Sequence, residues 1–387
     1  MKRLPLTIGI VGAGPAGLYF ALLMKKSNPA HRITIVEQNP AHLTYGWGVV
    51  FSGRALSFLR SMDVDSYGEI EGQMQKWDDQ TIIHKNEAVR IDGSVYSGIA
   101  RIALLNILQR HCRRVGVEIR FEERINDLDL FSGYHLIVGA DGVNSTVRAQ
   151  LAEFFQPRIS FLSNKYIWYG THQLFDTLSL IFREYRNGCY VGHCYRYSDS
   201  LSTFIVECDE ATWERAGFAR MGEQESKAYC EEIFRADLKG HSLLSNKAAW
   251  LNFKAVVNQN WRYDNVVLLG DALRTVHFSI GSGTRMALED AIAVYRAFEE
   301  HPEVDEALKA FEERHRPNVD RLLSIARRSY DWYENFHCKM GMDAMGLAYD
   351  YMMRSGRIDF AALKQRAPRF SASYEAWAQR TGQDKRV

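Results

Sequence analysis

The 387-residue chain lacks a long apolar run and a charge excess of either sign. No stretch approaches the ~18 consecutive apolar residues of a membrane-spanning helix. The apolar segment near the N-terminus is broken by glycines, so it predicts a folded strand and helix and not a signal peptide. The formal net charge is +1, which gives no overall field to recruit nucleic acid or an anionic membrane. At roughly 100–200 residues per domain, this length allows two or three domains.

Paired cysteine motifs are also missing. The chain has six cysteines without a C-x-x-C pair or a disulfide-framework spacing, and several lie in apolar, strand-like surroundings. We therefore expect reduced thiols and a cytoplasmic location. Internal repeats and low-complexity tracts are absent as well, which excludes solenoid and linker-rich architectures.

The N-terminus carries a nucleotide-binding pattern. Residues 6–24 read as a β-branched strand, a glycine turn and a helix, and residues 31–36 read as a second strand. Gly12-x-Gly14-x-x-Gly17 occupies the turn, and Glu37 follows Gly17 by 20 residues. This placement predicts a pyrophosphate at the helix start and ribose hydroxyls on Glu37. The motif alone does not separate FAD from NAD. The predicted contacts are Gly12, Gly14, Pro15, Ala16, Gly17, Glu37 and Gln38.

Two later strand ends carry further polar turns. "GADGVNSTVR" places Asp141 after a strand, although by itself it is equally consistent with an ordinary Asp-Gly turn. "LGDA" places Asp271 where a ribityl or ribose hydroxyl could bind. Gly281 and Gly283 then allow backbone N–H groups to approach a flavin ring edge, with Thr284 beside them. A nicotinamide-binding Rossmann domain needs no such late element.

The order of these three motifs around an inserted set of aromatic-rich strands at 165–208 resembles the class A FAD-dependent aromatic hydroxylases, the p-hydroxybenzoate hydroxylase fold. Particular segments are similar to the branch with salicylyl-CoA 5-hydroxylase and 2-aminobenzoyl-CoA monooxygenase, and more distantly to the violacein-pathway tryptophan hydroxylase. Those segments are "YGWGVVFS" (45–52), "NKYIWYGT" (164–171), "STFIVEC" (202–208), "HFSIGSGT" (277–284) and "RSGRIDF" (354–360).

The resemblance implies an α/β fold with a Rossmann-like FAD-binding domain of the GR2 type. A substrate domain on a mixed β-sheet is interleaved with it, and the C-terminus is helical. The implied boundaries are 1–70, 95–155 and 255–300 for the FAD domain, 71–94 and 156–254 for the substrate domain, and 301–387 for the helical region.

The same resemblance assigns residues to the flavin. Arg101 is expected on the pyrophosphate, with a solvent-facing arginine at a helix start as the alternative. Asp271 is expected near the ribityl chain, and Asp141 is expected to support the FAD fold and the nicotinamide donor. The role of Arg274 stays open, because the wider fold often has histidine there.

The implied chemistry is monooxygenation. NADH or NADPH reduces FAD as a transient co-substrate, O₂ adds at C4a, and the C4a-hydroperoxide hydroxylates a small aromatic substrate in a dry cavity. His277 and Phe278 are the predicted catalytic residues, with His277 as the base that takes a substrate proton. The alternatives are a structural His277 and His193 as the base. The predicted substrate contacts are Trp47, Gly48, Tyr169, His193 and Tyr195.

The substrate is left between two classes. An aryl-CoA thioester, such as salicylyl-CoA or 2-aminobenzoyl-CoA, is favoured by the family-like segments; tryptophan or an indole-derived intermediate is the rival. A CoA ester needs basic groups at the pocket mouth. A flavin reductase or saturase and a non-enzymatic FAD-binding protein are the alternatives of another class. The chain is expected to be a monomer or homodimer without metal or nucleic acid. The arginines available for CoA are Arg183, Arg186, Arg327 and Arg328.

Overall fold

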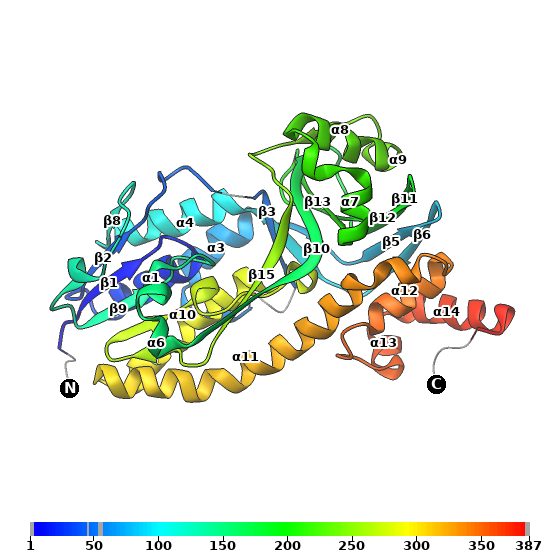
Figure 1. The fold of residues 1–387 in the computed structure, drawn as a ribbon. Helices are drawn as coiled ribbons and strands as arrows, with labels where there is room; N and C mark the ends of the chain where they lie inside the picture. The colour runs from blue at the N-terminus through cyan, green and yellow to red at the C-terminus, as the bar shows by residue number, and fades with distance from the viewer. Residues whose placement is uncertain (1–3, 45, 53–56, 384–387) are drawn as a thin grey trace.

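The computed structural model describes residues 4–44, 46–52 and 57–383, which form three β-sheets surrounded by helices. In Figure 1 the N-terminal sheet and its helices occupy one end, and the large sheet with β10 to β13 occupies the other. The long helix α11 (Val304–Glu334) runs beneath both and leads to the C-terminal helices. Tyr45, from the family-like "YGWGVVFS" segment, lies outside the described residues.

The first sheet has six strands in the order β16-β17-β9-β1-β2-β8. All neighbours pair in parallel apart from the antiparallel pair β16–β17. Helices cover this sheet, so its central strands are almost continuous apolar runs. Its strands are β1 (Thr7–Val11), β2 (Arg32–Val36), β8 (Glu118–Arg120), β9 (Leu136–Gly139), β16 (Arg262–Tyr263) and β17 (Val266–Leu268).

The second sheet has eight strands and is mostly antiparallel, with β5 joining β11 in parallel. A three-stranded sheet, β3-β7-β4, is separate from it. The eight strands are β5 (Gln80–His84), β6 (Glu87–Ile91), β10 (Pro157–Thr171), β11 (Leu178–Tyr185), β12 (Gly188–Arg196), β13 (Ser202–Cys208), β14 (Leu243–Leu244) and β15 (Leu251–Asn258). The three are β3 (Gly48–Ser52), β4 (Gln75–Trp77) and β7 (Tyr96–Ala100).

Helices pack around these sheets, and α10 lies between α1 and α11. The C-terminal helices bury Trp332 and Phe336 against Phe182 of the large sheet. The other helices are α1 (Pro15–Ser27), α2 (Ser57–Met62), α3 (Val64–Gly72), α4 (Arg101–Arg114), α5 (Thr146–Gln150), α6 (Ala152–Phe155), α7 (Glu210–Ala216), α8 (Glu223–Ile233), α9 (Arg235–Leu238), α10 (Gly283–Glu300), α12 (Ala344–Met353), α13 (Phe360–Arg366) and α14 (Pro368–Thr381).

The architecture confirms the predicted α/β class with a mixed sheet and a helical C-terminus. The predicted domain boundaries stay a prediction. The parallel sheet falls in the segments assigned to FAD and most of the mixed sheet in those assigned to substrate. The three-stranded sheet draws strands from both, and β15 crosses the boundary at 254/255.

Within the described part of the chain, no helix is long and apolar enough to cross a membrane. The six cysteines are free thiols.

Candidate active site

The turn between β1 and α1 is built by glycines with different tasks. Gly12 has φ +102°, and a Cβ there would lie 2.4 Å from the Ala140 carbonyl oxygen. A Cβ on Gly17 would lie 2.3 Å from the Gly12 oxygen, so both glycines are needed for close packing. Gly14 is different, because a Cβ there would meet no protein atom closer than 3.9 Å. The space left at Gly14 opens into a cavity.

Glu37 and Gln38 follow β2 at the edge of this turn. Glu37 accepts hydrogen bonds from the Ala13 N–H at 2.9 Å and the Asn39 N–H at 2.8 Å. The carboxylate is thereby fixed beside the glycine turn, where the sequence places it. Gln38 is exposed. Neither side chain lines the cavity that opens at Gly14.

That cavity has a volume of about 460 Å³ and joins all three nucleotide-binding motifs. Gly14 lines it from the first motif, Ala140 and Gly142 from the second, and Asp271 and Gly283 from the third. Parallel strands bring their carboxyl ends to one edge of a sheet, and this explains how segments far apart in sequence meet. The cavity is also lined by four other residues of the predicted cofactor set, Pro15, Ala16, Gly281 and Thr284.

Arg101 and Asp271 both line this cavity, and the charge of Arg101 acts on the Asp271 carboxyl. Arg101 begins α4, and its Nε is buried without a hydrogen-bond partner among the described residues. Asp271 is accessible from the cavity, yet the enclosing protein raises the pKa of its carboxyl against the opposing effect of Arg101 and Arg274. An unpartnered guanidinium beside a helix start is a binding site for an anion such as a pyrophosphate.

Asp141 supports the site from behind. Its Oδ2 accepts from the Thr146 N–H at 2.6 Å and the Val147 N–H at 3.2 Å, which caps α5. Its Oδ1 is buried without a partner, and burial raises the pKa of this carboxyl. Asp141 does not line the cavity. Arg148 links this motif to the third by donating to the Ala272 carbonyl at 3.0 Å.

Arg274 is a structural residue, which answers the question left by the sequence. Both of its terminal nitrogens lie 2.6 Å from the carboxylate oxygens of Asp290 on α10, and the pair is fully buried. Asp290 also accepts from the Gly270 N–H at 2.9 Å and contacts His315 Nε2 at 2.9 Å. Burial alone would raise the pKa of Asp290, but Arg274 and His315 hold it below its usual value. This network fixes the turn that presents Asp271.

The two predicted catalytic residues are neighbours in the loop before α10, but they lie in different surroundings. Phe278 lines the cavity, whereas His277 does not. His277 Nδ1 accepts from the Ser279 N–H at 3.2 Å, and its ring packs against Phe253 and Phe278. Burial lowers the pKa of His277 to about 4, so the ring is neutral near pH 7. The geometry matches the structural alternative for this histidine, and its catalytic role stays an untested prediction.

The far end of the cavity is an aromatic chamber on one face of the large sheet. Tyr195 lines it and donates to the Gly48 carbonyl at 2.8 Å, and Trp168 lines it beside them. Tyr169 points to the opposite face, into a cluster with Phe204, because neighbouring residues of a strand alternate. Trp47 also lies outside the lining, with its ring against Gly170.

His193 enters the chamber with a buried carboxylate behind it. Its Nε2 lies 2.8 Å from Glu207 Oε2, and Asn164 Nδ2 donates to Glu207 Oε1 at 2.8 Å. Glu207 is 1% exposed; burial would raise its pKa, but His193 and Asn164 keep it below the usual range. His193 lines the cavity, and its Nδ1 makes no hydrogen bond to any described residue, so this nitrogen is available to a ligand. The ring stands edge-on to Phe278 at 5.3 Å.

Sequence reasoning missed Glu207 and Asp290. Each reads as an ordinary residue of its element, one in the apolar strand "STFIVEC" and one in the helical "ALEDA". A signal for Glu207 exists, because a carboxylate in a strand without other charges predicts a buried partner. Asp290 carries no comparable signal, since helix carboxylates are usually solvated.

These residues fit an FAD molecule. The cavity offers the uncapped start of α1 at Gly14, the unpartnered Arg101 and the start of α10 at Gly283. Asp271 supplies a hydrogen-bond acceptor in the same cavity. An extended nucleotide with a central pyrophosphate matches this set of groups.

Comparisons with known proteins agree with an FAD-binding site. Residues 134–326 match the FAD binding domain family. The chain is 39% identical to salicyloyl-CoA 5-hydroxylase of a Streptomyces species over 85% of this chain and 65% of that protein, so it spans about two thirds of that relative. It is 39% identical to protodeoxyviolaceinate monooxygenase of Chromobacterium violaceum over 87% of this chain and 91% of that protein. This violacein-pathway relative is therefore as similar in sequence as the first, and its name gives protodeoxyviolaceinate as the substrate and not tryptophan.

A third relative, 3-hydroxy-4-methyl-anthranilyl-[aryl-carrier protein] 5-monooxygenase of Streptosporangium sibiricum, is 34% identical over 83% of this chain and 87% of that protein. Among solved structures, 2-methyl-3-hydroxypyridine-5-carboxylic acid oxygenase superposes with a TM-score of 0.72 at 19% identity, over 87% of this chain and 93% of that chain. The shared fold and the two relatives that match along most of their length define the family. The chain belongs to the FAD-dependent aromatic monooxygenases and is a flavoprotein hydroxylase.

Proposed function

We propose that this enzyme hydroxylates the activated aromatic ring of an aryl-CoA thioester such as salicylyl-CoA or 2-aminobenzoyl-CoA. The observation that carries the proposal is one continuous cavity, which is lined both by the flavin motifs and by the aromatic chamber with His193. NADH or NADPH is the electron donor, bound transiently, because Gly12-x-Gly14-x-x-Gly17 is the one such motif in the sequence.

The FAD would be held by this chain's own groups at three places. The starts of α1 and α10 direct N–H groups at it, Arg101 neutralises the pyrophosphate, and Asp271 accepts from hydroxyl groups. When bound and reduced, FAD supplies an activated oxygen atom from O₂ to an electron-rich ring.

His193 is proposed as the proton acceptor for the ring substituent. A phenol or aniline group becomes more electron-rich as it loses its proton, which favours attack on an electrophilic oxygen. The Nε2–H of His193 is directed to Glu207, which leaves Nδ1 as the acceptor on the cavity side. His193 takes this role in place of His277, because His277 lies outside the cavity lining.

The chamber keeps water from the reacting atoms. Its walls near His193 are apolar, and a dry site protects an oxygenating flavin from losing its oxygen as H₂O₂. The apolar and aromatic residues that contribute are Leu178, Leu180, Ile205, Phe253 and Phe278.

Support for the thioester comes from the names of two relatives. One acts on a salicyloyl group carried by coenzyme A, and another on an anthranilyl group carried by an aryl-carrier protein. An indole-derived intermediate is the second candidate, and it is favoured by the 39% identity to protodeoxyviolaceinate monooxygenase along 91% of that protein.

The test is a substrate panel with the FAD-loaded enzyme. NADH or NADPH oxidation is measured with salicylyl-CoA, 2-aminobenzoyl-CoA, tryptophan and an indole dimer, and the products are identified by mass spectrometry. A thioester should stimulate oxidation and gain one oxygen atom. Stimulation by an indole compound alone would support the second candidate and contradict the first.

A further inference from the structure

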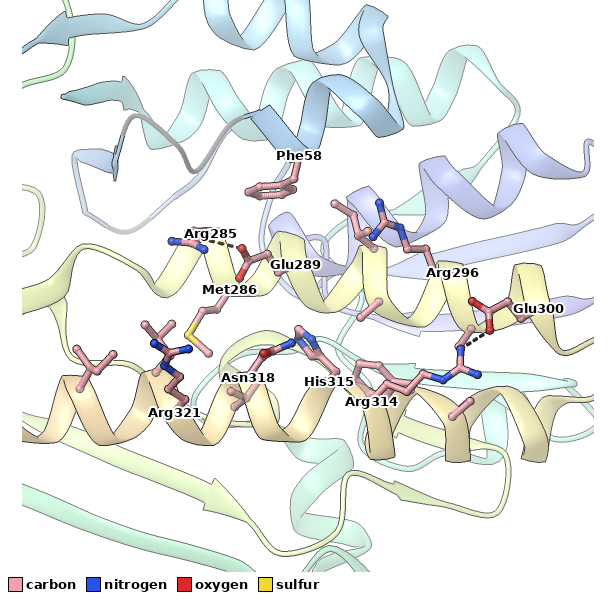
Figure 2. Close-up of a pocket in the computed structure, with 18 of the residues that line it drawn as sticks. Phe58, Arg285, Met286, Glu289, Arg296, Glu300, Arg314, His315, Asn318 and Arg321 are labelled. Atoms are coloured by element: carbon pink, nitrogen blue, oxygen red, sulfur yellow. Dashed lines mark hydrogen bonds and ion pairs between the residues drawn. The ribbon is translucent and has the colours of Figure 1, made fainter. Parts of the chain in front are cut away.

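A second cavity of about 640 Å³ lies between α10 and α11, under Phe58 of α2 (Figure 2). Arginines from both helices enter it. Arg285 and Arg296 come from α10, and Arg314 and Arg321 come from α11 (Figure 2). We call this cavity the arginine groove.

The arginine groove meets the flavin and substrate cavity. Leu322, Ile325 and Arg357 line both cavities, so the two share a wall along α11 and the turn after α12. A ligand too long for the first cavity therefore has an adjoining space that begins at Arg357.

Positive charge gathers at this junction. Arg285 pairs with Glu289 at 2.8 Å, but Arg321 and Arg357 make no hydrogen bond or ion pair to any described residue. Arg366 lines the first cavity nearby and contacts backbone and hydroxyl oxygens of Gly93 and Ser94.

Partial burial lowers the pKa of Arg357, and Arg366, Arg285 and Arg321 lower it further by repulsion. The overall net charge is only +1, so this concentration of arginines, with Arg321 and Arg357 unpaired, is a local feature. Such a cluster is stabilised by an anion that binds between its members.

The arginines that the sequence offered for CoA lie elsewhere. Arg183 is paired with Asp237 at 2.6 Å, and Arg186 lies over the Tyr185 ring. Arg327 and Arg328 are on α11 but line neither cavity, and Arg328 donates to the Ser355 carbonyl at 2.7 Å.

We propose that Arg321, Arg357 and Arg366 bind the phosphate groups of a nucleotide whose reacting end enters the flavin and substrate cavity. Guanidinium groups bind phosphate oxygens through paired N–H donors. The phosphates belong either to the CoA portion of the substrate or to the nicotinamide donor. The first source rests on the function proposed above, and the second does not.

The experiment compares Arg321→Ala, Arg357→Ala and the double variant with wild type as FAD-loaded enzymes. KM is measured for the aryl-CoA thioester, for the same aryl group on N-acetylcysteamine, which has no phosphate, and for NADH and NADPH. Arg327→Ala is the matched control, because it removes an arginine from the same helix outside both cavities.

The expected result is a KM for the CoA thioester raised about tenfold or more in the double variant, with an unchanged KM for the phosphate-free thioester. A raised KM for NADH or NADPH alone supports the phosphate site and assigns it to the donor. Unchanged KM values for all of these compounds, or an equal rise for both thioesters, would overturn the proposal. If wild type hydroxylates neither thioester, the proposed substrate class is wrong. The KM values for NADH and NADPH still test the phosphate site in that case.

A second measurement uses wild type only and does not depend on how the variants fold. Raising NaCl from about 50 mM to about 300 mM shortens the screening length, so it should raise KM for the phosphate-bearing ligand and leave KM for the phosphate-free thioester unchanged. Equal salt dependence of the two thioesters, together with a donor KM that does not respond to salt, contradicts a phosphate site.

Discussion

Two carboxylates near the cavity have pKa values shifted in opposite directions, because their surroundings differ. The pKa of Asp271 is raised by the enclosing protein, although the charge of Arg101 acts to lower it. The pKa of Glu207 is lowered, although it is more deeply buried, because His193 and Asn164 bind its two oxygens. Glu207 therefore stays ionised and orients His193, and Asp271 is left to accept from a ligand.

The His193→Gln variant tests the proposed proton acceptor. It should retain FAD but form hydroxylated product about 100-fold more slowly, because a positioned base typically contributes at least this much. The measurement is product formed per NAD(P)H oxidised, with H₂O₂ as the uncoupled product. His172→Gln is the control and should be unaffected, because His172 is an exposed histidine directly after β10 that contacts the Ser200 carbonyl. Coupled turnover at the wild-type rate would exclude the role of His193.

His277 predicts a pH dependence of stability. Its pKa falls from 6.5 to about 4 on folding, so the unfolded chain binds more protons between these values. Stability must then decrease as pH falls through this window, by about 3 kcal/mol in total. Urea unfolding at pH 7, 5.5 and 4.5 should show a steeper loss in wild type than in His277→Gln. Parallel loss in the two proteins would show that His277 is not buried in the neutral form.

At the scale of elements, the β1–α1 turn separates ligand binding from packing. Gly14→Ala adds a methyl group that points into open cavity, so the free energy of unfolding should change by less than about 1 kcal/mol. FAD affinity should fall about tenfold or more, because the backbone can no longer approach the pyrophosphate. Gly17→Ala should instead cost about 3 kcal/mol, because its methyl group meets the Gly12 oxygen.

Apo-protein denaturation and FAD titration measure the two effects separately. Equal loss of stability in both variants would contradict a ligand-facing Gly14.

The contact between α10 and the turn before it predicts a further stability effect. Asp290→Asn leaves Arg274 buried without its ionic partner, which should cost about 3–5 kcal/mol and weaken FAD binding through Asp271. Glu299→Gln, on the same helix but exposed, is the control and should change stability by less than about 0.5 kcal/mol. Chemical denaturation of both variants checks the prediction. A loss equal to that of the control would mean that the pair does not hold the turn.

At the scale of the whole molecule, the sequence predicted the flavin half better than the substrate half. Strand, turn and helix patterns locate Gly14 and Asp271 at strand ends, and parallel strands bring such ends together. The residues that line the chamber depend on which face of each strand points inward and on the register between strands, and composition sets neither. Trp168 and Tyr169 differ by one position and face opposite sides. Glu207 meets His193 only through tertiary packing. The same is true of the arginines that gather around Arg357.

Some properties of the whole chain stay predictions. These are the domain boundaries, the cytoplasmic location, the choice between NADH and NADPH, and the choice between monomer and homodimer. The pairing of one nucleotide site with one aromatic chamber does not depend on them.

The most direct test of this account is turnover under ¹⁸O₂. The FAD-loaded enzyme is supplied with NAD(P)H and the stimulating aromatic substrate, and the product is analysed by mass spectrometry. The account predicts one ¹⁸O atom on the aromatic ring of each product molecule. A reduced product, or a product without ¹⁸O, would contradict the hydroxylase mechanism at this cavity.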